Sequence, residues 1–94
     1  MTNIRNVTVL GTGVLGSQIA FQTAYSGFNV TAYDIGEAAL AQARGRFGAL
    51  VETYSREVEG APDGKAADGV SRILLTSDLA AAVVDADLVI EAVP

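Results

Sequence analysis

A glycine-rich turn between an apolar segment and a helical one constrains the fold of this chain more than any other feature. The β-type run Val7–Leu10 leads directly into Gly11-Thr12-Gly13-Val14-Leu15-Gly16, and a helical pattern begins inside that turn. Glycines at this spacing suit a tight strand-to-helix connection. The first makes the turn, the second lets backbone approach a pyrophosphate, and the third lets the helix lie close to the sheet.

The context of the turn decides whether it binds a ligand, because the same glycines could form a turn with no ligand at all. A second apolar run, Phe28–Tyr33, follows one helix later and ends in Asp34. An acid at the end of the second strand is where a ribose-binding carboxylate is expected in a dinucleotide site. No residue from Asn6 to Tyr33 carries a formal charge, so backbone dipoles at the helix N-terminus would bind the phosphates. The order of strand, glycines, helix, strand and acid predicts dinucleotide binding.

Asp34 also indicates which dinucleotide. A carboxylate can accept hydrogen bonds from the adenosine ribose hydroxyls, but it repels the extra phosphate of NADP. At about 5 Å each unit charge costs about 1–3 kcal/mol at effective dielectrics between those of water and a protein surface. The following residues 35–38 contain no arginine or lysine to offset this, so we predict NAD rather than NADP. The alternative role for Asp34 is that of a helix N-cap or turn residue.

Composition excludes several classes of function. The chain has 94 residues, enough for one small domain or part of a larger one. Its net charge of −5, without a basic cluster, argues against nucleic acid or an anionic membrane as partner. Because cysteine and histidine are absent, thiol catalysis, cysteine-ligated metals and the usual general base are excluded. We therefore assign no catalytic and no metal-binding residue. No signal peptide or membrane span is recognised, and we expect a cytoplasmic protein.

Strands and helices alternate along the chain. We predict helices at 14–26, 37–57 and 78–84, strands at 28–33, 72–75 and 88–93, and a loop or one short turn at 65–70. Gly27 is expected to end the first helix in a left-handed conformation, Gly45 and Gly48 weaken the second, and Ser77 is expected to cap the third. The alternation predicts an α/β fold, a Rossmann-type parallel sheet with strand order 3-2-1-4 that forms the N-terminal part of a larger nucleotide-binding domain. The long excursion 37–71 is either a helical arm that contacts substrate or a long helix followed by an irregular loop.

Five segments carry a resemblance to a known family: Val7–Gly16, Asn29–Asp34, Arg72-Ile73, Thr76–Leu79 and Ala86–Pro94. On these segments the chain resembles the L-3-hydroxyacyl-CoA dehydrogenase family, which includes 3-hydroxybutyryl-CoA dehydrogenases. The resemblance implies NAD as cofactor and oxidation of the 3-hydroxyl of a hydroxyacyl-CoA to a ketone, or the reverse. The residues implied to bind the cofactor are Gly11, Thr12, Gly13, Val14, Leu15, Gly16, Asp34, Ile35, Ala92, Val93 and Pro94. Glu91 belongs to the last segment, and we interpret it as a partly buried structural carboxylate rather than a catalytic group.

The same resemblance places the family's catalytic histidine and its orienting glutamate downstream of Pro94. We therefore expect residues 1–94 to be an incomplete N-terminal NAD-binding domain, inactive alone, without the rest of the sheet and the helical C-terminal domain. The substrate is expected to be a small molecule, an acyl-CoA. The mixed charges of the 37–71 segment, which is slightly acidic, leave a second possibility open, namely another hydroxy acid or carnitine. A third is a non-catalytic NAD-sensing module. The apolar run 88–93 is expected to lack its outer neighbour, which favours self-association and a homo-oligomer.

Overall fold

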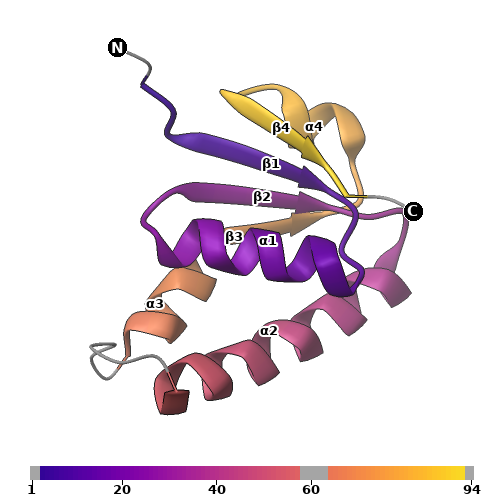
Figure 1. Cartoon of the computed structure of the whole chain (residues 1–94). Helices are drawn as coiled ribbons and strands as arrows, with labels where there is room; N and C mark the ends of the chain where they lie inside the picture. The colour runs from indigo at the N-terminus through magenta and orange to yellow at the C-terminus, as the bar shows by residue number, and fades with distance from the viewer. Residues whose placement is uncertain (1–2, 58–63, 93–94) are drawn as a thin grey trace.

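The computed structural model describes residues 3–57 and 64–92, which form one parallel sheet with helices on both faces (Figure 1). The strands pair in the order β3-β2-β1-β4, and every pair is parallel. This confirms the predicted α/β class and the predicted strand order. The elements are β1 (Asn6–Leu10), α1 (Val14–Tyr25), β2 (Asn29–Tyr33), α2 (Glu37–Glu57), α3 (Lys65–Ser71), β3 (Ile73–Thr76), α4 (Leu79–Val83) and β4 (Leu88–Glu91).

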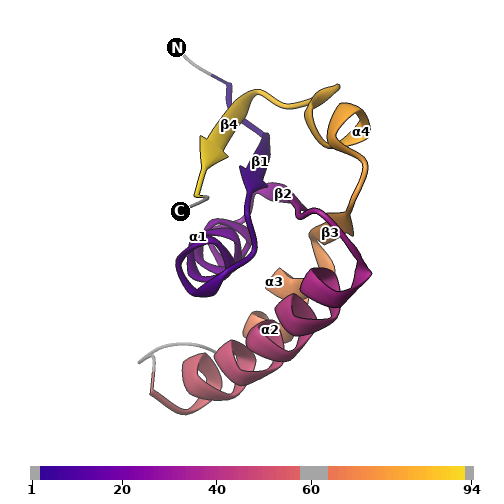
Figure 2. The same ribbon diagram turned by 90° about the vertical axis from the view of Figure 1, so that its right-hand side faces the viewer.

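The two faces of the sheet are covered unequally. Figure 2 shows α1, α2 and α3 on one side of the sheet and the short α4 on the other. The core lies between the sheet and the three helices, where alternate strand residues are buried. It consists of Val7, Val9, Ala20, Phe21, Ala24, Val30, Ala32, Ala43, Phe47 and Ala66. On the α4 side, Thr8 is buried and its hydroxyl donates to the carbonyl of Ala82.

Helices α1 and α2 largely match their predicted bounds. Gly27 follows α1 with a φ of +105°, the left-handed conformation that glycine adopts without strain. Helix α2 is unbroken although it contains Gly45 and Gly48. Both glycines lie on its exposed side, whereas Ala43 and Phe47 are buried in the core, so packing of the apolar face outweighs the low helix propensity of glycine.

The loop or single short turn predicted at 65–70 is wrong, because these residues belong to the seven-residue helix α3. Gly69 lets this helix approach α1 closely: a Cβ added there would lie 3.2 Å from the Cα of Tyr25. Lys65 covers the same residue, with its Nζ 4.6 Å from the centre of the Tyr25 ring. These contacts stabilise a short helix whose own sequence, with a glycine near its end, does not predict one.

The predicted cap of the third predicted helix is also wrong by one residue. Asp78, not Ser77, caps α4, because the Asp78 Oδ1 accepts a 3.1 Å hydrogen bond from the Ala81 amide. The helix then begins at Leu79. The predicted strand at 88–93 is shorter in the structure, where β4 runs from Leu88 to Glu91 and Ala92 lies beyond it. Residue 93 lies outside the described residues. Within residues 3–57 and 64–92, none of the helices has the length and hydrophobicity needed to cross a bilayer.

Candidate cofactor-binding site

The glycine-rich turn joins the end of β1 to the start of α1, as the sequence predicts. Gly11 has a φ of +104°, and its amide donates a 2.8 Å hydrogen bond to the carbonyl of Tyr33, the last residue of β2. Gly13 is the N-cap of α1, and no side chain caps the helix there. The first amides of α1 therefore point out at the carboxyl edge of the sheet, where ligands bind in open parallel sheets.

The second and third glycines of the turn have different surroundings. A Cβ at Gly16 would overlap the carbonyl oxygen of Gly11, lie 2.8 Å from its carbonyl carbon and 3.4 Å from the Cβ of Ala92. A Cβ at Gly13 would meet no atom within 4 Å. Gly16 thus permits close packing of helix and turn, whereas the surface over Gly13 is open. This is the arrangement that a backbone cradle for a diphosphate requires, so these residues fit a dinucleotide.

Asp34 follows β2 and is bonded directly to the glycine-rich turn. Its Oδ2 accepts hydrogen bonds from the Thr12 amide at 2.8 Å and from the Thr12 hydroxyl at 2.7 Å. Its Oδ1 accepts a 2.7 Å bond from the Ile35 amide. Thr12 is itself held by the Ser17 hydroxyl, which donates to its carbonyl at 2.8 Å. The bonds that Asp34 accepts in the described structure thus come from Thr12 and Ile35 and not from α2, so Asp34 is not an N-cap of that helix.

These contacts keep the Asp34 carboxylate ionised. Partial burial by itself would raise its pKa, but hydrogen bonds from the Thr12 hydroxyl, the Thr12 amide and the Ile35 amide outweigh burial. Together with the positive charge of Arg46 on α2, they bring the pKa below its ordinary value. Sequence reasoning missed Arg46, because α2 carries it back toward the start of α1 and no local pattern signals that return. There it lines a hollow of about 160 Å³ with residues that include Val14 and Ser17.

The predicted site residues meet at one cleft of about 550 Å³ at the carboxyl edge of the sheet. It is lined by Gly11, Gly13, Val14, Leu15, Asp34, Glu91 and Ala92. Thr12 and Gly16 lie buried beneath this surface, and Ile35 is exposed beside it without lining the cleft. The interpretation of Glu91 as a partly buried structural carboxylate is wrong, because Glu91 is exposed and lines the cleft. Two predicted residues, Val93 and Pro94, lie outside the described residues.

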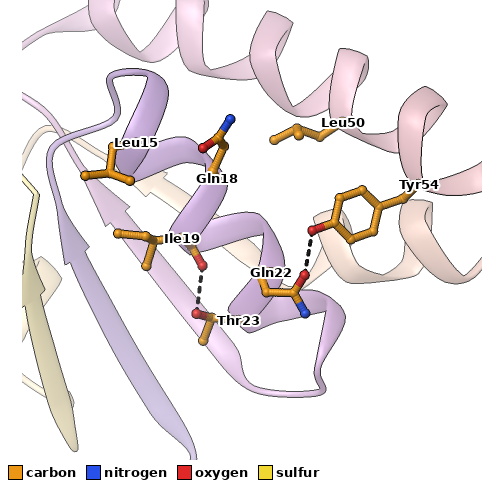
Figure 3. Close-up of a pocket in the computed structure, with 7 residues that line it drawn as sticks. All are labelled: Leu15, Gln18, Ile19, Gln22, Thr23, Leu50 and Tyr54. Atoms are coloured by element: carbon orange, nitrogen blue, oxygen red, sulfur yellow. Dashed lines mark hydrogen bonds between the residues drawn. The ribbon is translucent and has the colours of Figure 1, made fainter. Parts of the chain in front are cut away.

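A second hollow, of about 480 Å³, lies between α1 and α2 (Figure 3). Figure 3 shows residues of α1 along one side and Leu50 and Tyr54 of α2 facing them, with the Tyr54 hydroxyl donating to the Gln22 side chain. Its lining residues are Leu15, Gln18, Ile19, Gln22, Thr23, Leu50 and Tyr54, none of which is charged. Because its lining includes neither a glycine of the turn nor a carboxylate, the cleft at the glycine-rich turn is the better candidate for a dinucleotide site.

The parallel sheet, its glycine-rich turn, the open helix N-terminus and the acid after the second strand define a Rossmann-type dinucleotide-binding domain. The family model described as "3-hydroxyacyl-CoA dehydrogenase, NAD binding domain" matches residues 6–94. The chain therefore belongs to the 3-hydroxyacyl-CoA dehydrogenase family, as its NAD-binding domain, and its cofactor is NAD. This confirms the resemblance seen in the sequence.

Individual relatives agree with this family. A probable 3-hydroxyacyl-CoA dehydrogenase of Caenorhabditis elegans is 43% identical over 96 residues, which cover 98% of this chain and 32% of the relative. A solved diketoreductase structure is 64% identical with a TM-score of 0.95, and the match covers 100% of this chain and 33% of that one. The 3-hydroxybutyryl-CoA dehydrogenase structure from Escherichia coli is 30% identical with a TM-score of 0.88, over 99% of this chain and 19% of that one. The chain thus spans a third or less of the length of these relatives.

Proposed function

We propose that NAD binds in the cleft at the glycine-rich turn, with its diphosphate on the amides at the start of α1 and its adenosine ribose on Asp34. The observation that carries this proposal is the open space over Gly13 next to a carboxylate held ionised in the same cleft. Backbone amides at a helix N-terminus favour an anion, and the free face of the carboxylate favours a sugar diol. Ala92 and Glu91 would border the cofactor from the end of β4.

We further propose that residues 1–94 are the N-terminal, incomplete NAD-binding domain of an enzyme that transfers a hydride between NAD and the 3-hydroxyl of a hydroxyacyl-CoA. Bound NAD supplies the hydride acceptor, and the residues of this chain bind and orient it. Proton transfer to or from the substrate oxygen needs a positioned acid–base group, and the chain contains no histidine. We therefore expect the 94-residue polypeptide alone not to turn over acetoacetyl-CoA with NADH.

A second substrate class is supported by a specific observation. The similar structure at 64% identity is named a diketoreductase that acts on dicarbonyl compounds, and helix α2 carries both basic and acidic residues rather than a basic cluster suited to the phosphates of coenzyme A. The alternative is a related hydroxy acid, carnitine or dicarbonyl substrate that carries no coenzyme A. Rates of the longer protein with acetoacetyl-CoA and with free diketones would distinguish the two classes.

NADH titration, followed by the change in NADH fluorescence, tests the proposed binding site. Asp34→Asn removes the negative acceptor but keeps the size of the side chain. A hydrogen bond to a charged group contributes about 1.5–3 kcal/mol, so the variant should bind NADH about 10- to 100-fold more weakly and discriminate less against NADPH. Asp68→Asn makes the same chemical change at an exposed site on α3 and should bind NADH like the wild type. Unchanged NADH binding by Asp34→Asn would refute the site.

A further inference from the structure

Thr12, the residue between the first two glycines of the turn, contacts the Asp34 carboxylate through two separate groups. Both its amide and its hydroxyl donate to the same oxygen, Oδ2, at 2.8 and 2.7 Å. Thr12 is only 1% exposed, so a ligand in the cleft cannot reach its side chain directly. Any effect of Thr12 on a bound cofactor must therefore pass through Asp34 or through the backbone of the turn.

The contacts leave one part of the carboxylate free. An ionised carboxylate offers about four lone-pair positions on its two oxygens. Thr12 occupies two of them on Oδ2, and the Ile35 amide occupies one on Oδ1 at 2.7 Å. The remaining acceptor position is on Oδ1, and Asp34 lines the cleft. The arrangement thus fills Oδ2 with bonds from the protein and leaves one acceptor position on Oδ1 for a ligand.

Two bonds to one oxygen hold the carboxylate in a way that a single bond does not. Without the hydroxyl, the Thr12 amide on Oδ2 and the Ile35 amide on Oδ1 would remain, and the carboxyl group would be held by fewer bonds about its terminal torsion, which has a broad energy profile. The Thr12 hydroxyl comes from a β-branched side chain with restricted χ1. The hydroxyl therefore acts on the orientation of Asp34 from a fixed position.

We propose that Thr12 is a positioning residue for cofactor specificity: its hydroxyl orients the Asp34 carboxylate so that the remaining acceptor position on Oδ1 meets a ribose hydroxyl of NAD and the carboxylate opposes the 2′-phosphate of NADP. The inference rests on the proposed binding of NAD at this cleft. It assigns to the residue between the first two glycines a role in distinguishing the two coenzymes, in addition to the shape of the turn. A carboxylate that is free to turn would interact less with the diol and oppose the phosphate less.

The test compares NADH and NADPH affinities of four variants, measured in the same fluorescence titration. Thr12→Ala and Thr12→Val remove the hydroxyl, and each should bind NADH about tenfold more weakly than the wild type while NADPH affinity stays the same or rises. Thr12→Ser keeps the hydroxyl and should restore the wild-type preference for NADH. Ser17→Ala is the matched control, because it removes a neighbouring buried hydroxyl that holds the backbone of the turn without touching Asp34. It should weaken both coenzymes alike, since both share the diphosphate.

The ratio of the two affinities separates positioning from general loosening of the turn. The proposal is overturned if Thr12→Ala keeps the wild-type ratio, or if Thr12→Ser loses as much preference as Thr12→Ala. Including Asp34→Asn separates this inference from the proposed function. A loss of NADH binding in Asp34→Asn with no change in Thr12→Ala would reject the role of Thr12 and keep the site. Wild-type NADH binding by both variants would reject the site itself.

Discussion

Replacing Gly16 by alanine should destabilise the protein, although alanine is the better helix former. In an exposed helix interior, a glycine-to-alanine change stabilises by about 0.5–1 kcal/mol. At Gly16 the new Cβ would overlap the carbonyl oxygen of Gly11 and lie 2.8 Å from its carbonyl carbon. Both atoms belong to backbone, and the amide of Gly11 is bonded to Tyr33 at 2.8 Å. The clash therefore can be relieved only by moving α1 away from the turn.

Crowding of this kind in a packed interior costs about 1–3 kcal/mol, and more when backbone has to move. For a domain of this size each kcal/mol lowers the midpoint of thermal unfolding by about 4–8 °C, so Gly16→Ala should melt about 5–20 °C below the wild type. Movement of the turn by about 1 Å would also displace the amides expected to meet the diphosphate. Displacements of that size can cost about 100-fold in a positioned site, and NADH binding should fall accordingly.

Gly13→Ala is the matched control in the same turn. Its Cβ would meet no protein atom within 4 Å, and its φ of −66° suits alanine. The melting temperature should therefore stay within about 2 °C of the wild type, because the change adds no strain. The added methyl group would still occupy the space expected for the diphosphate, so NADH binding should be lost. Circular dichroism melts and NADH titration of both variants measure the two effects separately.

Two results would refute this reasoning. A Gly16→Ala variant that is as stable as the wild type would mean that helix and turn do not approach as closely as described. A Gly13→Ala variant that binds NADH normally would mean that the diphosphate lies elsewhere.

Further predictions concern stability and association. Gly45→Ala, at an exposed position of α2 with nothing within 4 Å, should raise the free energy of unfolding by about 0.5–1 kcal/mol in urea titrations. Asp78→Ala should lower it by about 1 kcal/mol through loss of the α4 cap, whereas Ser77→Ala should change it by less than about 0.5 kcal/mol; equal effects would contradict the assignment of the cap. The pKa of Asp34 is lowered from 3.8 in the folded protein, so the charge of Asp34 stabilises the fold at neutral pH. This stabilisation is lost as the pH falls below 3.8 and the carboxylate takes up a proton. In thermal melts from pH 7 to pH 2, the melting temperature of the wild type should therefore approach that of Asp34→Asn. In the described residues β4 pairs only with β1, so its other edge is unpaired and the wild type should self-associate at tens of micromolar. In sedimentation experiments Val89→Lys should reduce this self-association. A monodisperse wild-type monomer would contradict the prediction.

Sequence patterns predict those features of this fold that depend on residues close together in the chain. In β2, Val30 and Ala32 alternate with Asn29 and Thr31, a pattern typical of a strand with one buried face, and both are buried. The left-handed Gly27 was predicted from its position after a helical pattern, and α2 begins and ends at the predicted residues. The parallel order followed from the alternation of strands and helices together with the known handedness of crossover connections.

What the sequence did not predict depends on contacts between distant segments. Helix α3 forms where Gly69 packs on Tyr25, and the composition of the segment alone favours a loop. The bond between Thr12 and Asp34 spans 22 positions, and Arg46 approaches that carboxylate only because α2 returns over the start of α1. The sequence thus predicts Asp34 as a ligand residue, which stays a prediction, but it gave no sign of Thr12 and Arg46, the side chains that act on its charge and orientation.

The attachment of the glycine-rich turn to the end of β2 has a consequence for how a cofactor would be captured. Gly11 and Thr12 each donate a hydrogen bond to a residue at the end of β2. The shape of the turn is therefore fixed when the sheet forms, before any ligand binds. Because the turn is preorganised, binding does not include the entropy loss of ordering a flexible loop. Capture should therefore be fast and leave the backbone almost unmoved, and nuclear magnetic resonance spectra with and without NADH should differ in side chains around the turn far more than in strand positions.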